Sequence, residues 1–123
     1  MLAAVAVGSS EELVFTGNPT VRVDADDQGT KRIELSESGG QKFACRVVKN
    51  GRRYYWASRG NRELIRSKSG DFTYFTSPEG SGYIKVFSGR REGGPDLAFD
   101  YLEHVSSEFK TITYWGKQTG NLR

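Results

Sequence analysis

The feature that most constrains this chain is a series of short β-rich runs, each bounded by glycine, asparagine, aspartate or proline. The runs recur about every ten residues with turn-forming residues between them, which is typical of an antiparallel β-sandwich or a small β-barrel. A chain of 123 residues fits one domain. We therefore expect a mainly β fold, with a single β-rich domain over residues 11–117 and a polar tail over 118–123.

The clearest local signal is Asn50-Gly51, which stands between the β-rich runs Lys42 to Val48 and Arg52 to Ser58. Asn-Gly favours a two-residue hairpin turn, because both residues tolerate a positive φ. A two-residue loop at these positions fixes the register of the hairpin. It predicts that Val47 lies opposite Tyr54.

The two faces of this hairpin differ, because side chains alternate across a strand. The apolar face, which we expect to face the core, carries Phe43, Cys45, Val47, Tyr54 and Trp56. The opposite face is mixed and carries Ala44, Arg46, Val48, Arg53, Tyr55 and Ala57.

Other runs alternate in the same way. Thr20 to Asp24 and Lys31 to Leu35 predict a hairpin joined by a polar turn that ends at Gly29. Leu13 to Thr16 predicts a strand that ends at Gly17-Asn18-Pro19. Further strands are predicted by four runs, 63–67, 72–76, 83–87 and 110–115.

Residues Leu97 to Val105 fit two interpretations. As a strand, they place one set of alternating side chains on one side and the other set on the opposite side: Leu97, Phe99, Tyr101, Glu103 and Val105 against Ala98, Asp100, Leu102 and His104. As a helix near residues 96–108, they begin with Pro95 and Asp96 in the first turn. We favour the strand, because both neighbouring runs are strands.

Charge is distributed unevenly along the chain, which carries a net charge of +3. Residues 42–91 contain twelve basic and three acidic residues, whereas both flanking segments are net acidic. Such asymmetry favours an anionic partner for the middle segment, or neutralisation by the flanks within the fold.

The basic middle segment is interleaved with aromatic residues. Arginine and lysine neutralise phosphates, and exposed rings stack on bases, so residues 42–68 form a candidate surface for nucleic acid or another polyanion. The alternative is a solvated outer face that protects strand edges. The candidate ligand-binding residues are Arg46, Arg53, Tyr55, Arg59 and Arg62.

Signals for catalysis or metal binding are weak. His104 is the one histidine, and it supports only the alternative of a small hydrolase. Cys45, the one cysteine, is expected to be buried. Asp24 to Gly29 resembles half of a calcium loop but fits a polar turn better. We therefore predict no catalytic residue, no metal and no cofactor.

The leading functional hypothesis is a non-catalytic binding or interaction module, with a protein or a polyanion as partner. Opposite charges on one chain and an exposed edge strand also permit a homo-oligomer. No run is long enough for a membrane span. Met1 to Ser10 is either a disordered tail or the remnant of a signal segment, so exported (periplasmic) and cytoplasmic locations both stay open.

Overall fold

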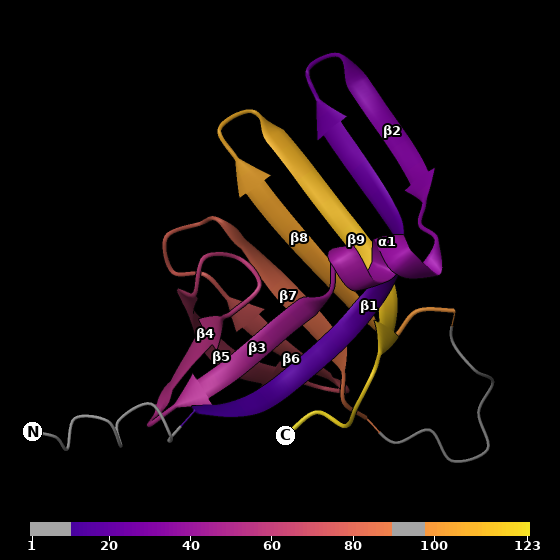
Figure 1. Cartoon of the computed structure of the whole chain (residues 1–123). Helices are drawn as coiled ribbons and strands as arrows, with labels where there is room; N and C mark the ends of the chain where they lie inside the picture. Colours follow the sequence, from indigo (N-terminus) through magenta and orange to yellow (C-terminus); the bar gives the residue numbers. More distant parts are fainter. Residues whose placement is uncertain (1–10, 90–97) are drawn as a thin grey trace, which may run out of the picture.

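One antiparallel sheet curls on itself until its first and last strands pair, which closes an eight-stranded barrel (Figure 1). The computed structural model describes residues 11–89 and 98–123. The predicted mainly β fold is confirmed, as a barrel with one short helix. The elements are β1 (Glu11–Asp26), β2 (Gly29–Glu34), α1 (Glu37–Lys42), β3 (Cys45–Asn50), β4 (Arg53–Trp56), β5 (Arg62–Ser69), β6 (Phe72–Thr76), β7 (Gly82–Phe87), β8 (Tyr101–Ser107) and β9 (Lys110–Gln118).

β1 closes the barrel because its two halves pair with different strands. Residues 11–17 pair with β3, whereas residues 17–25 pair with β9, and β2 lies along the far end of β1. The predicted end of the strand at Gly17-Asn18-Pro19 is wrong, because β1 runs through these residues. The register shifts beside Pro19, so the bulge accommodates a residue without an N–H, and the strand bends instead of ending.

Two glycines permit the close packing at this bend. The ring of Tyr101 lies against Gly17, where a Cβ would collide with the ring carbons. Gly116 of β9 lies opposite Pro19, and a Cβ there would collide with the backbone of Asn18. These positions require glycine because neighbouring backbone or a buried ring fills the space of a side chain.

The β3–β4 hairpin forms as predicted, but its two-residue loop lies one position later in the chain than predicted. Val47 lies opposite Trp56 rather than Tyr54, because the loop consists of Gly51 and Arg52. Gly51 has φ 65° at the first loop position, where a type II′ turn favours glycine. The pairing partner of each residue therefore moves by two positions. Because side chains alternate with a period of two, each one keeps its predicted face.

The interior of the barrel is filled with side chains. Cys45, Val47 and Trp56 from the predicted core face are buried, and half-buried Tyr54 packs against them. Phe43 lies outside β3, because the chain forms α1 up to Lys42. An eight-stranded barrel is just wide enough for its own side chains or one small ligand. Here the space is taken by Phe15, Val47, Trp56, Phe75, Ile84 and Val86, each 1% exposed or less.

The one described helix lies where no helix was predicted. α1 begins after Ser36, whose side chain accepts a hydrogen bond from the Gly39 backbone N–H, and Gly40 packs tightly against the Pro19 carbonyl. Two adjacent glycines give this segment a low helix propensity, so its sequence does not predict a helix. The strand interpretation of Leu97 to Val105 is confirmed over residues 101–105, which belong to β8. Residues 98–100 precede the strand, and residue 97 lies outside the described residues.

The two ends of the barrel differ. We call the end from which the β1–β2 and β8–β9 hairpins project the mouth, and the opposite end, near the C-terminus, the base (Figure 1). At the base, the Arg123 backbone N–H donates to the Val14 carbonyl, and Leu122 packs against the core. The predicted tail or signal remnant at residues 1–10 lies outside the described residues. Among the described residues, no helix has the length and apolar character needed to cross a membrane.

We predict that Gly116→Ala lowers the free energy of unfolding by about 1–3 kcal/mol, because the new Cβ forces apart the β1 and β9 backbones. Urea unfolding followed by tryptophan fluorescence measures this change. Gly120→Ala is the matched control, because its Cβ would make an ordinary contact of 3.9 Å with Thr16. Equal stability of the two variants would contradict the account of the bend.

Candidate functional site

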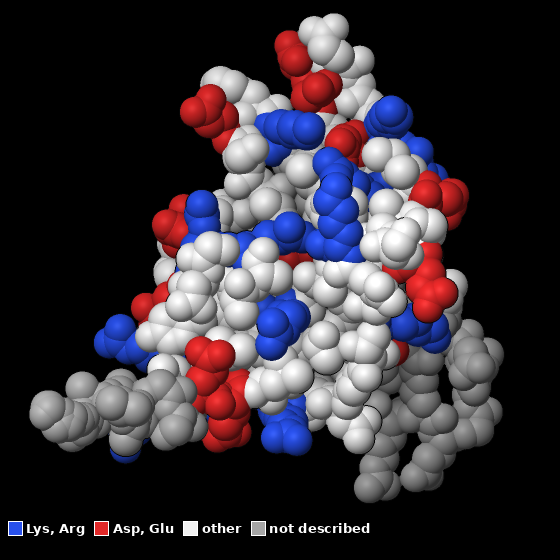
Figure 2. Space-filling view, in the orientation of Figure 1, with Lys and Arg blue, Asp and Glu red and all other residues white. Residues whose placement is uncertain are grey.

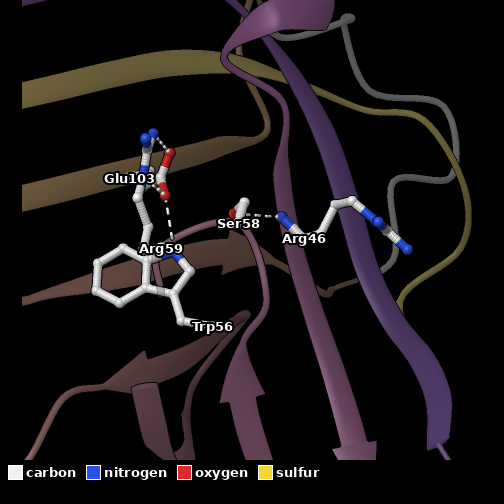
Figure 3. Close-up of polar contacts among 5 residues, drawn as sticks. All are labelled: Arg46, Trp56, Ser58, Arg59 and Glu103. Carbon is white, nitrogen blue, oxygen red and sulfur yellow. Dashed lines mark hydrogen bonds and ion pairs between the residues drawn. The ribbon is translucent and has the colours of Figure 1, made fainter. Parts of the chain in front are cut away.

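The structure separates the five predicted ligand-binding residues. Arg46, Arg53 and Tyr55 lie on the outer face of β3 and β4, as the alternation predicted. The exposed guanidinium of Arg53 lies 3.8 Å from the Glu63 carboxylate. Arg46 is exposed and its side chain points away from the barrel interior (Figure 3).

Arg59 and Arg62 lie apart from that outer face. Both follow β4 in the chain, on either side of a tight turn in which Gly60 and Asn61 have positive φ values of 73° and 58°. This turn directs the Arg59 side chain into the mouth, toward Glu103 (Figure 3). Arg62 pairs at 3.0 Å with Glu79. The five predicted residues therefore do not form one site.

Glu103 is the centre of a buried polar cluster at the mouth. Its carboxylate is 0% exposed and accepts hydrogen bonds from Trp56 Nε1 at 2.7 Å and from Arg59 Nε and Nη2 at 3.0 and 2.9 Å (Figure 3). A buried charge requires such partners, because its desolvation is otherwise too costly. The sequence carried a signal for this cluster, since Glu103 interrupts the apolar side of its strand.

Aromatic rings and a second ion pair extend this cluster across the mouth. The Arg59 guanidinium lies 4.9 Å from the Tyr114 ring centroid, and the Arg22 guanidinium lies 5.0 Å from that of Phe43. Arg22 is itself held by two hydrogen bonds to Asp24, at 2.7 and 3.1 Å. In the side view of Figure 2, Lys and Arg side chains lie across the middle of the molecule below the hairpins, and acidic side chains lie at the hairpin tips.

The pKa shifts at the mouth follow from burial and pairing. Burial disfavours the charged form of Arg59, but the hydrogen bonds and negative charge of Glu103 outweigh it, so the pKa of Arg59 is raised. The hydrogen bond from Arg22 lowers the pKa of Asp24. Both arginines therefore already neutralise a carboxylate. This pairing fits a cluster that holds the mouth together better than a site for a further anion.

Beneath the cluster lie two buried groups that resist ionisation. Burial raises the pKa of the Cys45 thiol well above its usual value, and burial likewise raises the pKa of the Tyr101 hydroxyl. The Tyr101 hydroxyl has no hydrogen-bond partner among the described residues. The expectation that Cys45 is buried is confirmed.

A cavity of about 580 Å³ opens at the base. Three cations line it, Arg66 and Lys68 from β5 and Lys117 from β9, together with one carboxylate, Asp100. The remaining lining residues are Phe87, Ser88, Gly89, Gln118, Asn121 and Leu122. We call this the base cavity. Arg66 and Lys68 belong to the predicted basic segment, whereas pattern analysis missed Lys117.

The three cations in the base cavity have no Asp or Glu partner among the described residues. Arg66 is fixed, because its Nη1 donates to the Arg123 carbonyl at 2.8 Å and its guanidinium lies over the Tyr54 and Phe75 rings. Lys68 and Lys117 are exposed and form no ion pair within residues 11–89 and 98–123. Asp100 accepts a hydrogen bond from the Gln118 backbone N–H at 2.7 Å.

The side chains considered for catalysis and calcium are engaged elsewhere. His104 stacks on Tyr83 on the outer face, and its Nδ1 lies 3.0 Å from Thr113 Oγ1. In the polar turn, Asp26 accepts a hydrogen bond from the Gln28 N–H at 2.8 Å. Among the described residues, no group of three or more histidine, cysteine, aspartate or glutamate side chains is placed to hold a metal.

Comparisons with known proteins give no further guide to the site: no protein-family model, no curated protein and no solved structure matched the chain.

We predict that Glu103→Leu lowers the free energy of unfolding by about 3 kcal/mol, because it leaves the partly buried Arg59 guanidinium and the buried Trp56 N–H without an acceptor. Adding Arg59→Leu recovers part of this loss, since no unpaired guanidinium remains. Chemical unfolding of the single and double variants measures the coupling. Glu63→Gln, which breaks the exposed Arg53 pair, changes stability by less than about 0.5 kcal/mol. A loss as small as this for Glu103→Leu would refute the structural role of the cluster.

We also predict that Cys45 does not react with a thiol reagent in the native protein at pH 8, because it is buried and its raised pKa disfavours the reactive thiolate. Labelling becomes rapid once urea unfolds the chain. A Ser69→Cys variant supplies the control, because residue 69 is exposed and its thiol reacts at once. Rapid labelling of native Cys45 would contradict the closed barrel.

Proposed function

We propose that this protein is a non-catalytic binding module whose base cavity takes a small anionic ligand carrying a phosphate-type group. The main support for this proposal is that Arg66, Lys68 and Lys117 all line one cavity of about 580 Å³. Only one carboxylate, that of Asp100, lines the same cavity. Small-molecule sites in proteins commonly measure about 300–1,000 Å³.

The filled interior supports a site at an end of the barrel. Large side chains such as Trp56, Phe15 and Phe75 occupy the space where a wider barrel would hold a ligand. At the mouth, Arg22 and Arg59 are already paired with Asp24 and Glu103. The base cavity combines open volume with three cations and a single carboxylate, whereas the lysines beside the hairpin tips share their cavity with Asp24 and Asp26.

The chemistry of the lining fits an anion held at several points. Arg66 is stacked on rings, which pre-organises one guanidinium and reduces the entropy lost on binding. Lys68 and Lys117 approach from different strands and supply mobile ammonium groups. The Ser88 hydroxyl is a further polar group: it accepts a hydrogen bond from Thr73 at 2.9 Å and donates a long one to the Asp71 carbonyl at 3.4 Å, which it can exchange for a ligand oxygen. A phosphate-type group accepts hydrogen bonds from all of these donors.

The proposal retains the anionic partner inferred from the basic middle segment, but moves it to other residues. Arg46, Arg53 and Tyr55 line none of the best-formed cavities in the described part of the chain, and Arg53 is near Glu63. The hydrophobic part of the base cavity, Phe87 and Leu122, favours a small organic anion over a long polyanion.

Nuclear magnetic resonance titration of the ¹⁵N-labelled protein with pyrophosphate tests the proposal. We predict that the amide signals of Ser88, Gly89, Lys117 and Gln118 shift together, and that binding weakens when the salt concentration rises from about 50 to about 200 mM, because salt screens the exposed charges. The double variant Lys68→Glu/Lys117→Glu binds at least about tenfold more weakly, because two charge-assisted contacts are lost.

The matched control is Arg46→Glu/Arg53→Glu, which changes the net charge by the same amount on the outer face. It leaves pyrophosphate affinity within about twofold, since these residues lie outside the cavity. Loss of binding in this variant, with the base-cavity variant unaffected, would return the site to the outer hairpin face. Tighter binding of a single-stranded oligonucleotide than of pyrophosphate would replace the small ligand by a nucleic acid.

A further inference from the structure

β2 is the one strand in the described ranges that pairs along a single side. Its other edge is open, and the hairpin that it forms with β1 projects beyond the barrel (Figure 1). The strand is short and all of its residues except half-buried Ile33 are exposed. An open edge of this kind offers backbone groups to another strand.

The hydrogen bonding at the end of the hairpin shows which backbone groups face outward. The Leu35 N–H donates to the Thr20 carbonyl at 2.9 Å, so the backbone of residue 35 faces β1. Because inward and outward groups alternate along an antiparallel strand, the backbone of Ile33 also faces β1. The N–H and C=O groups of Thr30, Arg32 and Glu34 therefore lie along the free edge.

The charges on β2 are self-complementary in one antiparallel register. If a two-fold axis passes beside Ile33, Arg32 lies opposite Glu34 of the second copy, and Glu34 lies opposite its Arg32. In the same register, the outward backbone groups of positions 32 and 34 face each other and can form hydrogen bonds. Opposite charges directly across two strands stabilise the pair.

The neighbouring two-fold registers lack this match. An axis at Arg32 places Arg32 opposite itself, and an axis at Glu34 places Glu34 opposite itself. Like charges directly opposite one another destabilise a strand pair. Within one molecule, Arg32 and Glu34 already contact each other at 2.9 Å on the exposed face, so a second copy would extend this pair into an alternating row.

We infer that two copies of this chain associate through the free edges of β2, in the register that places Ile33 beside the two-fold axis. The two barrels then share one continuous sheet across the axis. Charged side chains on an edge strand usually oppose such pairing, but here they select a single register. The edge is short, and interfaces below about 1,200 Å² are typically weak and transient.

Sedimentation equilibrium from about 10 µM to 1 mM tests the association, because a weak dimer populates only in the upper part of this range. We expect the average mass of the wild-type protein to rise with concentration. Arg32→Glu and Glu34→Arg each weaken the dimer at least about tenfold, since each places like charges opposite one another. The double variant Arg32→Glu/Glu34→Arg restores it, because the opposite charges are only exchanged.

A disulfide tests the register itself. Opposite residues that do not exchange hydrogen bonds lie with Cα atoms about 4.5 Å apart, within the range that a disulfide spans. Ile33→Cys in a Cys45→Ala background should therefore form a covalent dimer under mild oxidation. Thr30→Cys in the same background is the control, because it lies opposite Ser36 of the second copy and forms no such link.

A protein that stays monomeric up to about 1 mM would overturn the inference, since even a weak dimer populates at that concentration. So would a dimer that Arg32→Glu leaves unchanged, or one that the double variant does not restore, because association would then use another surface or register. The edge of β2 belongs to the mouth hairpin, whereas the base cavity is at the other end of the barrel. Lys68→Glu/Lys117→Glu should therefore leave the dimer intact, which keeps this inference separate from the proposed ligand site.

Discussion

The two edges of β1 close this sheet into a barrel. One edge pairs with β3 and the other with β9, and the two pairings meet at Gly17. Because β1 turns at Gly17 and Pro19, its first half completes one side of the barrel and its second half completes the other. Closure leaves β2 outside the barrel, as an extension of the sheet with one free edge.

Closure also decides where polar chemistry can lie. Because the barrel has eight strands, its interior is narrow, and aromatic and branched side chains fill it. Glu103 is tolerated inside because Trp56 and Arg59 satisfy its carboxylate, so the mouth is held together by polar contacts. The ligand site that we propose is at the base, where exposed lysines from strands distant in sequence line open volume.

The sequence predicted the features that depend on local alternation and failed where tertiary pairing decides. The predicted faces of the β3–β4 hairpin are correct although its predicted register is not. The loop lies one position later than predicted, so each pairing partner changes by two residues and every side chain stays on its predicted face. Arg59 was grouped with outward arginines, since a pattern does not reveal that the turn at Gly60 directs it inward. Lys117 was missed because only barrel closure brings β9 near Arg66 and Lys68.

The central claim is that β1 closes the barrel by pairing with both β3 and β9. Native-state amide hydrogen exchange tests this pairing strand by strand. If both pairings hold, the hydrogen-bonded amides in residues 17–25 of β1 and 111–118 of β9 exchange as slowly as those of β6 and β7, through global unfolding. Rapid exchange along the β1–β9 pair, with slow exchange elsewhere, would show an open sheet and contradict it.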